Sequence, residues 1–401
     1  MKEILVTEPK FASEFSCIGS DCREHCCQGW TINLDKASVR RYLKSKDFTI
    51  RKIAQDAINV TKKDEGRWGE IIFSEETNNC PFMDSERLCS VHTKLGGAAL
   101  SHTCSTYPRG ARTYKNEIEK YVSLSCPEAT RLLLTDPEAM LMYQTINIQP
   151  VFNSASTKSD VQKVVHLFCM SLLSANSDSI EANLYAIVKL LLFIEKVGSV
   201  EDNIQAIENM YVNVSNSLSN GDIERDMLRF NKNYKLKNSV VYLLQTYLSP
   251  KKSLRGYAAI KIYLDALNHT VDYSGSENVV AEPLREIEQT WNDTLKPWLK
   301  GREHIFVNYL QYKMWQKNFP QDNGREYLSN FYLIVAEYYF IKVLIGALLM
   351  TKTPISEDVL INAVYSFHSL TQHSATAEEM FQQYLQTIKL GDNLSLIQLL
   401  N

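Results

Sequence analysis

From residue 160 onward, apolar residues recur at intervals of three and four, which places them on one face of a helix. The clearest stretches are DVQKVVHLFCMSLL, IEANLYAIVKLLLFIEKV, LKNSVVYLLQTYL, LRGYAAIKIYLDAL and EDVLINAVYSFHSL. Segments rich in Gly, Ser, Asn and Pro separate these stretches, as connections between helices do. The pattern predicts an all-α helical domain over residues 151–401.

The first 150 residues lack this uniform spacing and predict a mixed, loop-rich module. Asp35 suits the N-cap of a helix that runs from about Lys36 into the sixties. GEIIF predicts a short strand, ARTYKNEIEKYVSLS a hairpin, and Cys126-Pro127-Glu128 a helix start with proline in the first turn. The predicted fold class is therefore mainly α, with a cysteine-rich module over 1–150 followed by the helical domain over 151–401.

One C-terminal stretch, FYLIVAEYYFIKVLIGALLM at 331–350, is long enough to cross a bilayer. It carries Glu337 and Lys342 near its middle, and each charge would be costly in hydrocarbon unless paired. The stretch therefore predicts a buried central helix and no transmembrane segment, with peripheral membrane contact left open.

Composition narrows the class of protein. With 45% hydrophobic and 22% charged residues, the 401-residue chain can bury more than one core. The net charge of -3 and the lack of a basic patch argue against nucleic acid as a partner. The opening MKEILVTEPKFASEF has charges throughout and no apolar run of signal-peptide type, so we expect a cytoplasmic protein.

Eight of the nine cysteines fall in the first 126 residues, which in a reducing compartment indicates metal or redox chemistry. The candidate metal ligands are Cys17, Cys22, Cys26, Cys27, Cys80, Cys89, Cys104 and Cys126. Their spacing is not that of a zinc ribbon, and adjacent thiolates reach different corners of an iron-sulfur cubane more easily than one zinc ion. The spacing favours an iron-sulfur cluster of the 4Fe-4S type, with structural zinc as the alternative.

Other residues near these cysteines are assigned differently. Cys169 lies within an apolar helix pattern and is expected in the core. His25, His92 and His102 are more typical of supporting groups than of ligands, so they stay outside the metal set. A glycine-rich nucleoside loop, a Walker loop and the common hydrolase motifs are all absent from the sequence.

Two sets of residues carry a resemblance to known families. Cys26-Cys27, Cys80-Pro81-Phe82, Cys89-Ser90-Val91-His92 and Cys104-Ser105-Thr106-Tyr107-Pro108 resemble a group of cysteine-rich zinc- or iron-chelating proteins. KEILVTEPKFASEFSCIGSDCREHCCQGWTINLDK, together with SHTCSTYPR and the helical remainder, more closely resembles the flagellin lysine N-methylase family.

This second resemblance implies an enzyme that transfers methyl groups from S-adenosylmethionine to lysine ε-amines of flagellin in the cytosol, and an iron-sulfur cluster in the cysteine-rich region. The chain lacks the glycine-rich loop of Rossmann methyltransferases, and Gly29 stands where the radical-enzyme pattern begun by Cys22 and Cys26 needs a third cysteine. The S-adenosylmethionine site and the catalytic base are therefore unassigned, with Tyr107 as one candidate base. A non-catalytic metal-binding scaffold and a redox module, each with a helical partner-binding domain, remain the alternatives.

Overall fold

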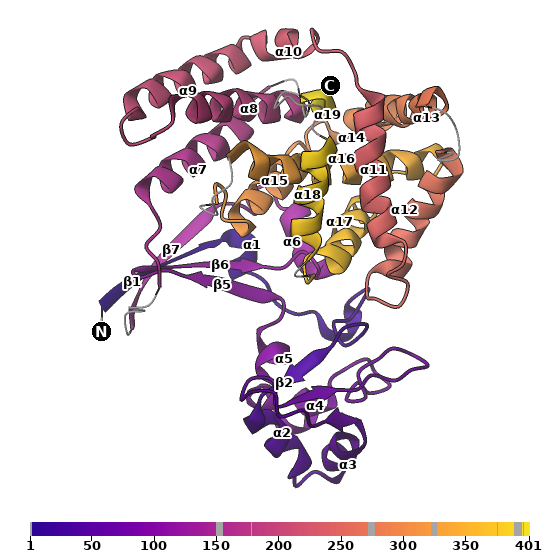
Figure 1. Ribbon diagram of the computed structural model, residues 1–401. Helices are drawn as coiled ribbons and strands as arrows, with labels where there is room; N and C mark the ends of the chain where they lie inside the picture. The colour runs from indigo at the N-terminus through magenta and orange to yellow at the C-terminus, as the bar shows by residue number, and fades with distance from the viewer. Residues whose placement is uncertain are drawn as a thin grey trace.

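The computed structural model describes residues 2–149, 155–177, 179–271, 277–321, 327–374, 376–388, 395 and 397–401. A small cysteine-rich module lies at one end of the molecule, and a larger body of helices with one sheet lies at the other (Figure 1). The predicted domain boundary at 150/151 lies outside the described residues, so the division at that point stays a prediction.

The strands form two sheets. A four-stranded sheet has the order β5-β6-β1-β7, and a three-stranded sheet in the module has the order β2-β4-β3. The strands are β1 (Lys2–Pro9), β2 (Ile32–Leu34), β3 (Ile58–Asn59), β4 (Gly69–Ile71), β5 (Arg109–Thr113), β6 (Glu117–Val122) and β7 (Met142–Gln149). Strand β4 and the β5–β6 hairpin confirm the predictions from GEIIF and ARTYKNEIEKYVSLS. Strands β1 and β7 were not predicted.

Strand β1 joins the first residues of the chain to the larger sheet. It runs parallel to β6 with Val6 opposite Ile118, and antiparallel to β7 with Val6 opposite Thr145. Ile4 and Val6 are buried while their neighbours are more exposed, which is the alternation expected of a strand with one covered face. The N-terminus is therefore part of the helical body and not of the cysteine-rich module.

The module contains short helices around a small core. They are α2 (Lys36–Leu43), α3 (Phe48–Ala57), α4 (Ser90–Leu95) and α5 (His102–Thr106), with 3-10 turns at Gly19–Asp21 and Gly97–Ala99. Asp35 caps α2 by accepting from the Ser38 amide at 2.8 Å, as predicted. The single helix predicted into the sixties is wrong, because Asp47 caps a second helix by accepting from the Ile50 amide and this helix ends at Ala57.

The body contains the other helices. They are α1 (Lys10–Ser13), α6 (Pro127–Thr135), α7 (Asp160–Leu173), α8 (Ile180–Val197), α9 (Ile204–Ser219), α10 (Asp222–Met227), α11 (Tyr234–Leu248), α12 (Tyr257–Thr270), α13 (Glu277–Thr290), α14 (Lys296–Leu299), α15 (His304–Gln316), α16 (Tyr327–Met350), α17 (Glu357–Thr371), α18 (Ala377–Ile388) and α19 (Ile397–Leu400), with a π turn at Trp291–Leu295. The predicted fold class, a mixed N-terminal part followed by a mainly helical part, is confirmed.

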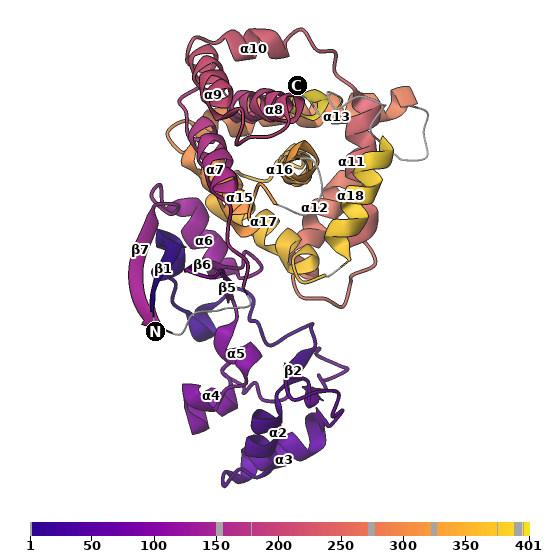
Figure 2. The ribbon, with the colours of Figure 1, turned by 60° about the vertical axis from the view of Figure 1, so that its left-hand side comes forward.

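Helix α16 is the centre of the body. Figure 2 views it nearly end-on, with other helices around it. It is long and apolar enough to cross a membrane, but 89% of its most apolar window is buried against other parts of the chain. Glu337 pairs with Lys313, and Lys342 pairs with Glu181. Both charges in this helix are therefore paired inside the body, as the prediction of a buried central helix required.

Candidate functional site

The eight candidate cysteines lie in two neighbouring groups. Electrostatic interactions connect the thiols of the first group with one another, although they come from two loops and the short helix α5. This group contains Cys26, Cys27, Cys80, Cys89 and Cys104. The second group contains Cys17, Cys22 and Cys126, and Cys22 also interacts with Cys26. The structure therefore brings together residues that lie up to 109 positions apart in the sequence.

Short backbone contacts hold the first group in place. The Cys80 amide donates to the Cys27 carbonyl at 2.8 Å, and the Trp30 indole donates to the Cys26 carbonyl at 2.5 Å. Cys89 forms an isolated β-bridge with Met83. These bonds place the double cysteine against the Cys80–Cys89 loop, so the thiols meet because the loops are paired.

Burial makes Cys80 and Cys104 of this group hard to ionise by themselves. It raises the pKa of Cys80 to about 12 and that of Cys104 to about 11, and neighbouring thiols add to both shifts. A hydrogen bond with Cys27 lowers the pKa of Cys26 and raises that of Cys27. Thiolates in such a place need a nearby positive charge, and a soft metal ion supplies one.

The side chains of the first cysteine group are of the kind that binds a metal through thiolates. Its members are soft ligands, they are largely buried, and the His25 Nδ1 atom beside them is buried without a hydrogen-bond partner. Within the described part of the chain, however, no three Cys, His, Asp or Glu side chains are arranged to hold a metal ion. The assignment of eight cysteine ligands therefore stays a prediction.

Arg255 connects the second cysteine group to the body. This side chain is buried, and its Nη1 atom donates to the Tyr107 hydroxyl at 2.6 Å. Its Nη2 atom donates to the Ser125 carbonyl, and its Nε atom lies 3.6 Å from Glu24 Oε2. Burial raises the pKa values of Cys22 and Cys126, and the positive charge of Arg255 offsets part of that rise. One guanidinium thus joins both parts of the molecule.

A chain of hydrogen bonds extends from this arginine into the helical body. The Tyr107 hydroxyl lies 2.9 Å from Ser125 Oγ, which lies 2.8 Å from His373 Nε2. Ser125 Oγ also contacts Ser123 Oγ at 2.7 Å, and Ser123 donates to Gln372 Oε1 at 2.9 Å. Burial raises the Tyr107 pKa to about 12, so this phenol is a poor base near neutral pH.

Further contacts fix the module against the loop between α11 and α12. A Cβ atom added at Gly29 would lie 2.5 Å from the Arg255 amide nitrogen, so only glycine fits there. Asn78 donates to the Ser253 carbonyl, and the Gly256 amide donates to Glu24 at 2.9 Å. These contacts define the junction as the surface where residues 22–30, 78 and 107 meet residues 253–256.

A polar cavity of about 430 Å³ lies on the body side of this junction. It is lined from α15, α16, α17 and α18 and by Arg112 of β5. Gln372 lines the cavity and also accepts from Ser123, so the cavity and the junction share one hydrogen-bond network. The volume suits a small-molecule ligand, and three cationic and two acidic side chains lie in its wall.

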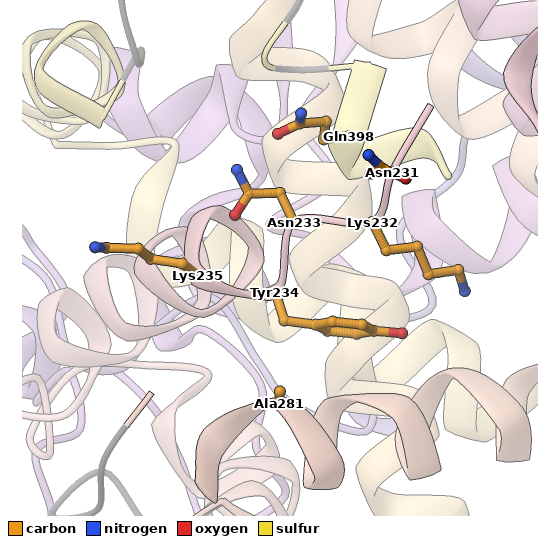
Figure 3. Close-up of a pocket in the computed structure, with 7 residues that line it drawn as sticks. All are labelled: Asn231, Lys232, Asn233, Tyr234, Lys235, Ala281 and Gln398. Atoms are coloured by element: carbon orange, nitrogen blue, oxygen red, sulfur yellow. The ribbon is translucent and has the colours of Figure 1, made fainter. Parts of the chain in front are cut away.

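A second cavity of about 300 Å³ lies at the start of α11, beside Ala281 of α13 and Gln398 of α19. Figure 3 shows the Lys232 and Lys235 side chains extending in opposite directions, with the Tyr234 ring over Ala281. Lys232 and Tyr234 both bind the Glu288 carboxylate at 3.0 Å. Because its lysines do not converge, this cavity is a weaker candidate for binding than the first.

Arg255 and the cavity residues were not predicted as site residues. Arg255 follows two lysines in SPKKSLRG, which reads as an exposed basic loop. The one sequence signal for the cavity was Glu337 within an apolar helix, because a buried carboxylate needs a partner. Cys169 is fully buried, which confirms its prediction as a core residue.

Known proteins are similar to this chain over its whole length. Residues 166–399, more than half of the chain, match the family of the FliB lysine N-methylase C-terminal domain. The chain is 40% identical over the full length of both proteins to the lysine-N-methylases of Salmonella typhimurium and Salmonella choleraesuis. It is also 56% identical over 142 residues to the flagellar biosynthetic protein FliU of Salmonella muenchen, covering 35% of this chain and 84% of that protein.

No solved structure matches the chain. The full-length relatives and the family match are together sufficient to assign the family. The chain therefore belongs to the FliB lysine N-methylase family, and it is an enzyme of the methyltransferase class.

Proposed function

We propose that this enzyme transfers methyl groups from S-adenosylmethionine to lysine ε-amines of flagellin, and that an iron-sulfur centre in the cysteine-rich module supports this activity. The observation that carries the proposal is the 40% identity to lysine-N-methylases over the full length of the chain. The flagellar names of two partial relatives support flagellin as the protein substrate. A cytoplasmic location, where flagellin is present before export, is part of this proposal.

The reaction sets one chemical requirement. A lysine ammonium with a pKa of about 10.4 must first lose a proton, because only the neutral amine has a lone pair. The nitrogen then forms a bond to the methyl carbon as the carbon–sulfur bond breaks, leaving S-adenosylhomocysteine. The methylated ammonium carries the positive charge that the sulfonium has lost. The protein must therefore exclude water, align the amine with the methyl group and accept one proton.

The proposed metal centre would be held by thiols of the first cysteine group, with Cys17, Cys22 and Cys126 beside it as further predicted ligands. Iron bound by thiolates supplies electron-transfer chemistry and fixes the loops that carry its ligands. The protein residues bury the thiols, pair their loops and place Arg255 between the centre and the body. This arrangement supports a role of the module in shaping the junction beside the cavity.

The first test is methyl transfer by the full-length protein purified without oxygen. Purified flagellin and S-adenosylmethionine with a labelled methyl group are added, and mass spectrometry locates methylated lysines. Labelled methyl-lysine on flagellin is the expected result. No methyl transfer by metal-loaded enzyme would contradict the proposal and favour a non-catalytic scaffold.

The second test is a measurement of iron, zinc and acid-labile sulfide on the same preparation, with an absorption spectrum. About four irons and four sulfides per chain are expected for one cubane cluster. Zinc without sulfide would show that the cysteines form a structural zinc site, and it would leave the methyltransferase proposal to the first test.

A further inference from the structure

The wall of the 430 Å³ cavity carries charges of both signs. Each cation is paired with a carboxylate: Arg112 with Glu119 at 2.8 Å, Lys313 with Glu337, and Lys317 with Glu378. The carboxylates Glu337 and Glu378 would repel a ligand that has only phosphate groups. The three cations would repel a ligand that has only positive charge. The wall therefore suits a small molecule that has both an anionic and a cationic group.

Asn318 adds a neutral hydrogen-bonding group that has no partner in the protein. Its side-chain Oδ1 atom is buried in the cavity wall and accepts no hydrogen bond in the described structure. The backbone of Asn318 has a φ of 54° at the end of α15, which explains why a residue tolerant of this conformation stands there. Glycine would adopt that backbone conformation equally well, so the conformation does not account for the amide side chain. The buried carbonyl oxygen of that side chain requires a hydrogen-bond donor.

The remaining wall fits a heterocycle and a sugar. The Phe381 ring is buried and supplies an aromatic surface, while Gln316 and Gln372 add amide groups. The Glu378 side chain is 37% exposed and can accept hydrogen bonds from ligand hydroxyl groups. An adenine amino group would supply the donor that the Asn318 carbonyl lacks.

We propose that this cavity is the binding site for S-adenosylmethionine, an inference that rests on the proposed function. The adenine amine donates to Asn318 Oδ1, the ribose hydroxyls donate to Glu378, and the amino-acid end of the ligand contributes the two charges that the wall matches. The methyl donor then lies beside Gln372, which the Ser123–Ser125 hydrogen bonds connect to the junction with the cysteine-rich module.

The site differs from the glycine-rich loop of Rossmann methyltransferases in its construction. Helices α15, α16, α17 and α18 and Arg112 of β5 form it, so that in this proposal side chains take the place of the glycine loop as the groups that contact the ligand. This explains how a chain with 15 glycines and no nucleoside loop motif can bind a nucleoside.

The test is calorimetric titration of the full-length, metal-loaded protein with S-adenosylhomocysteine, which has the same adenosine and amino-acid groups but is not consumed. Asn318→Gly removes the carbonyl acceptor without straining the backbone, and Glu378→Gln removes the carboxylate. Each variant is expected to raise the dissociation constant about tenfold, the effect of losing one good hydrogen bond in a buried site. Glu379→Gln, on an exposed neighbour outside the wall, is the matched control and should change the constant less than about twofold.

The outcomes separate the location from the activity. If the wild-type protein methylates flagellin and binds S-adenosylhomocysteine, but neither cavity variant weakens binding, the location is overturned and the proposed function stands. If the wild type neither binds the ligand nor transfers methyl groups, both proposals are overturned. ADP competing as well as S-adenosylhomocysteine would show a site for nucleotide phosphates and contradict the match to a zwitterion. Should Asn318→Gly lower the thermal unfolding temperature, Glu378→Gln decides the result.

Discussion

The two parts of the molecule are stabilised in different ways. The body has one continuous core that includes α16, the helices around it and the larger sheet. The cysteine-rich module has a separate, small core whose members come from short strands and helices, with Ile32, Leu34, Tyr42, Ile50 and Phe82 among the most buried. A core of this size rarely stabilises a module alone, so cysteine chemistry and the junction with the body must add to it.

The two parts of the molecule also differ in the kind of buried polar group that they hold. In the body, buried charges occur in pairs, as in Lys313–Glu337 and Lys342–Glu181, because a large apolar core must neutralise any charge inside it. In the module, the titratable groups that cluster in the interior are thiols, and burial raises the pKa values of Cys80 and Cys104 so that both stay neutral without a metal. The body can therefore hold a charged organic ligand, and the module is suited to a soft metal centre.

The largest expected effect comes from removing a thiol of the first cysteine group. Cys26→Ser or Cys27→Ser should lose most of the bound metal and unfold the module, because serine is a poor ligand for soft metals and the small core depends on the centre. Metal analysis and limited proteolysis measure the two effects. Cys169→Ser, in the body core, should keep its full metal content although the buried hydroxyl costs about 1 to 3 kcal/mol.

Equal metal loss in all three variants would contradict this prediction. It would show that general unfolding, and not ligation, controls the metal content.

The second effect concerns the charges of the body. Lys313→Met leaves the Glu337 carboxylate, whose side chain is 6% exposed, without its partner and should cost about 3 to 5 kcal/mol of unfolding free energy. Adding Glu337→Gln should recover much of the loss, since no uncompensated charge then remains. Urea unfolding measures both variants. Lys261→Met, which breaks the exposed pair with Asp265, is the control and should cost less than about 1 kcal/mol.

A single Lys313→Met variant as stable as the control would show that the pair is hydrated. Water in the polar cavity that both side chains line would then stabilise the unpaired Glu337 carboxylate, and the body would not require its buried charges to be paired.

The helices of the body were predictable because their signal is local. The stretches at 160–173 and 180–197 form α7 and α8 with those same bounds, since the apolar spacing lies within each segment and a capping serine, Ser159 or Ser179, stands directly before it. Strands β1 and β7 were missed because their partner strands are distant in sequence: Val6 pairs with Ile118 and Thr145. Strand β7 alternates Ile146 and Ile148 with polar residues, but both isoleucines are exposed, so the alternation does not mark a buried face.

The site was predictable only in its residue types. The cysteine spacing identified a thiol-rich region, but which thiols meet depends on how the Cys80–Cys89 loop pairs with the double cysteine. Arg255 has its partners Glu24, Tyr107 and Ser125 more than a hundred residues away, so nothing near it in the sequence indicates that it is buried. The cavity needs four helices to be in place before its wall exists.

The third effect concerns the contact between the module and the body at the junction. Gly29→Ala places a Cβ atom 2.5 Å from the Arg255 amide nitrogen at a φ of 69°, and it should cost about 2 to 3 kcal/mol through overpacking and backbone strain. Gly221→Ala has a similar φ of 71° in the left-handed helical region, and its Cβ would meet only the Arg225 guanidinium at an ordinary 3.5 Å, so it should cost only the strain of about 1 kcal/mol. The difference between the two free energies of unfolding isolates the contact between module and body. If both glycines cost the same, the module and the body do not meet at this point in solution.

The smallest effect is a pH dependence that belongs to the body alone. Burial, together with the nearby Lys158, lowers the pKa of His166 from 6.5 to about 4, while Nδ1 binds the Phe319 carbonyl at 2.7 Å. Between pH 4 and 6.5 the ring is neutral in the folded state and takes up a proton on unfolding, so protons favour the unfolded state. The contribution of His166 to the free energy of unfolding is therefore complete above pH 6.5 and is lost as the pH falls toward 4. Between pH 6.5 and about pH 5 the free energy of unfolding should fall by about 1 to 2 kcal/mol from this residue. In His166→Asn, whose amide can still donate to Phe319, this part of the slope should disappear in urea titrations at several pH values. A slope unchanged in the variant would mean that other groups titrate in this range, and that the body core does not hold His166 neutral.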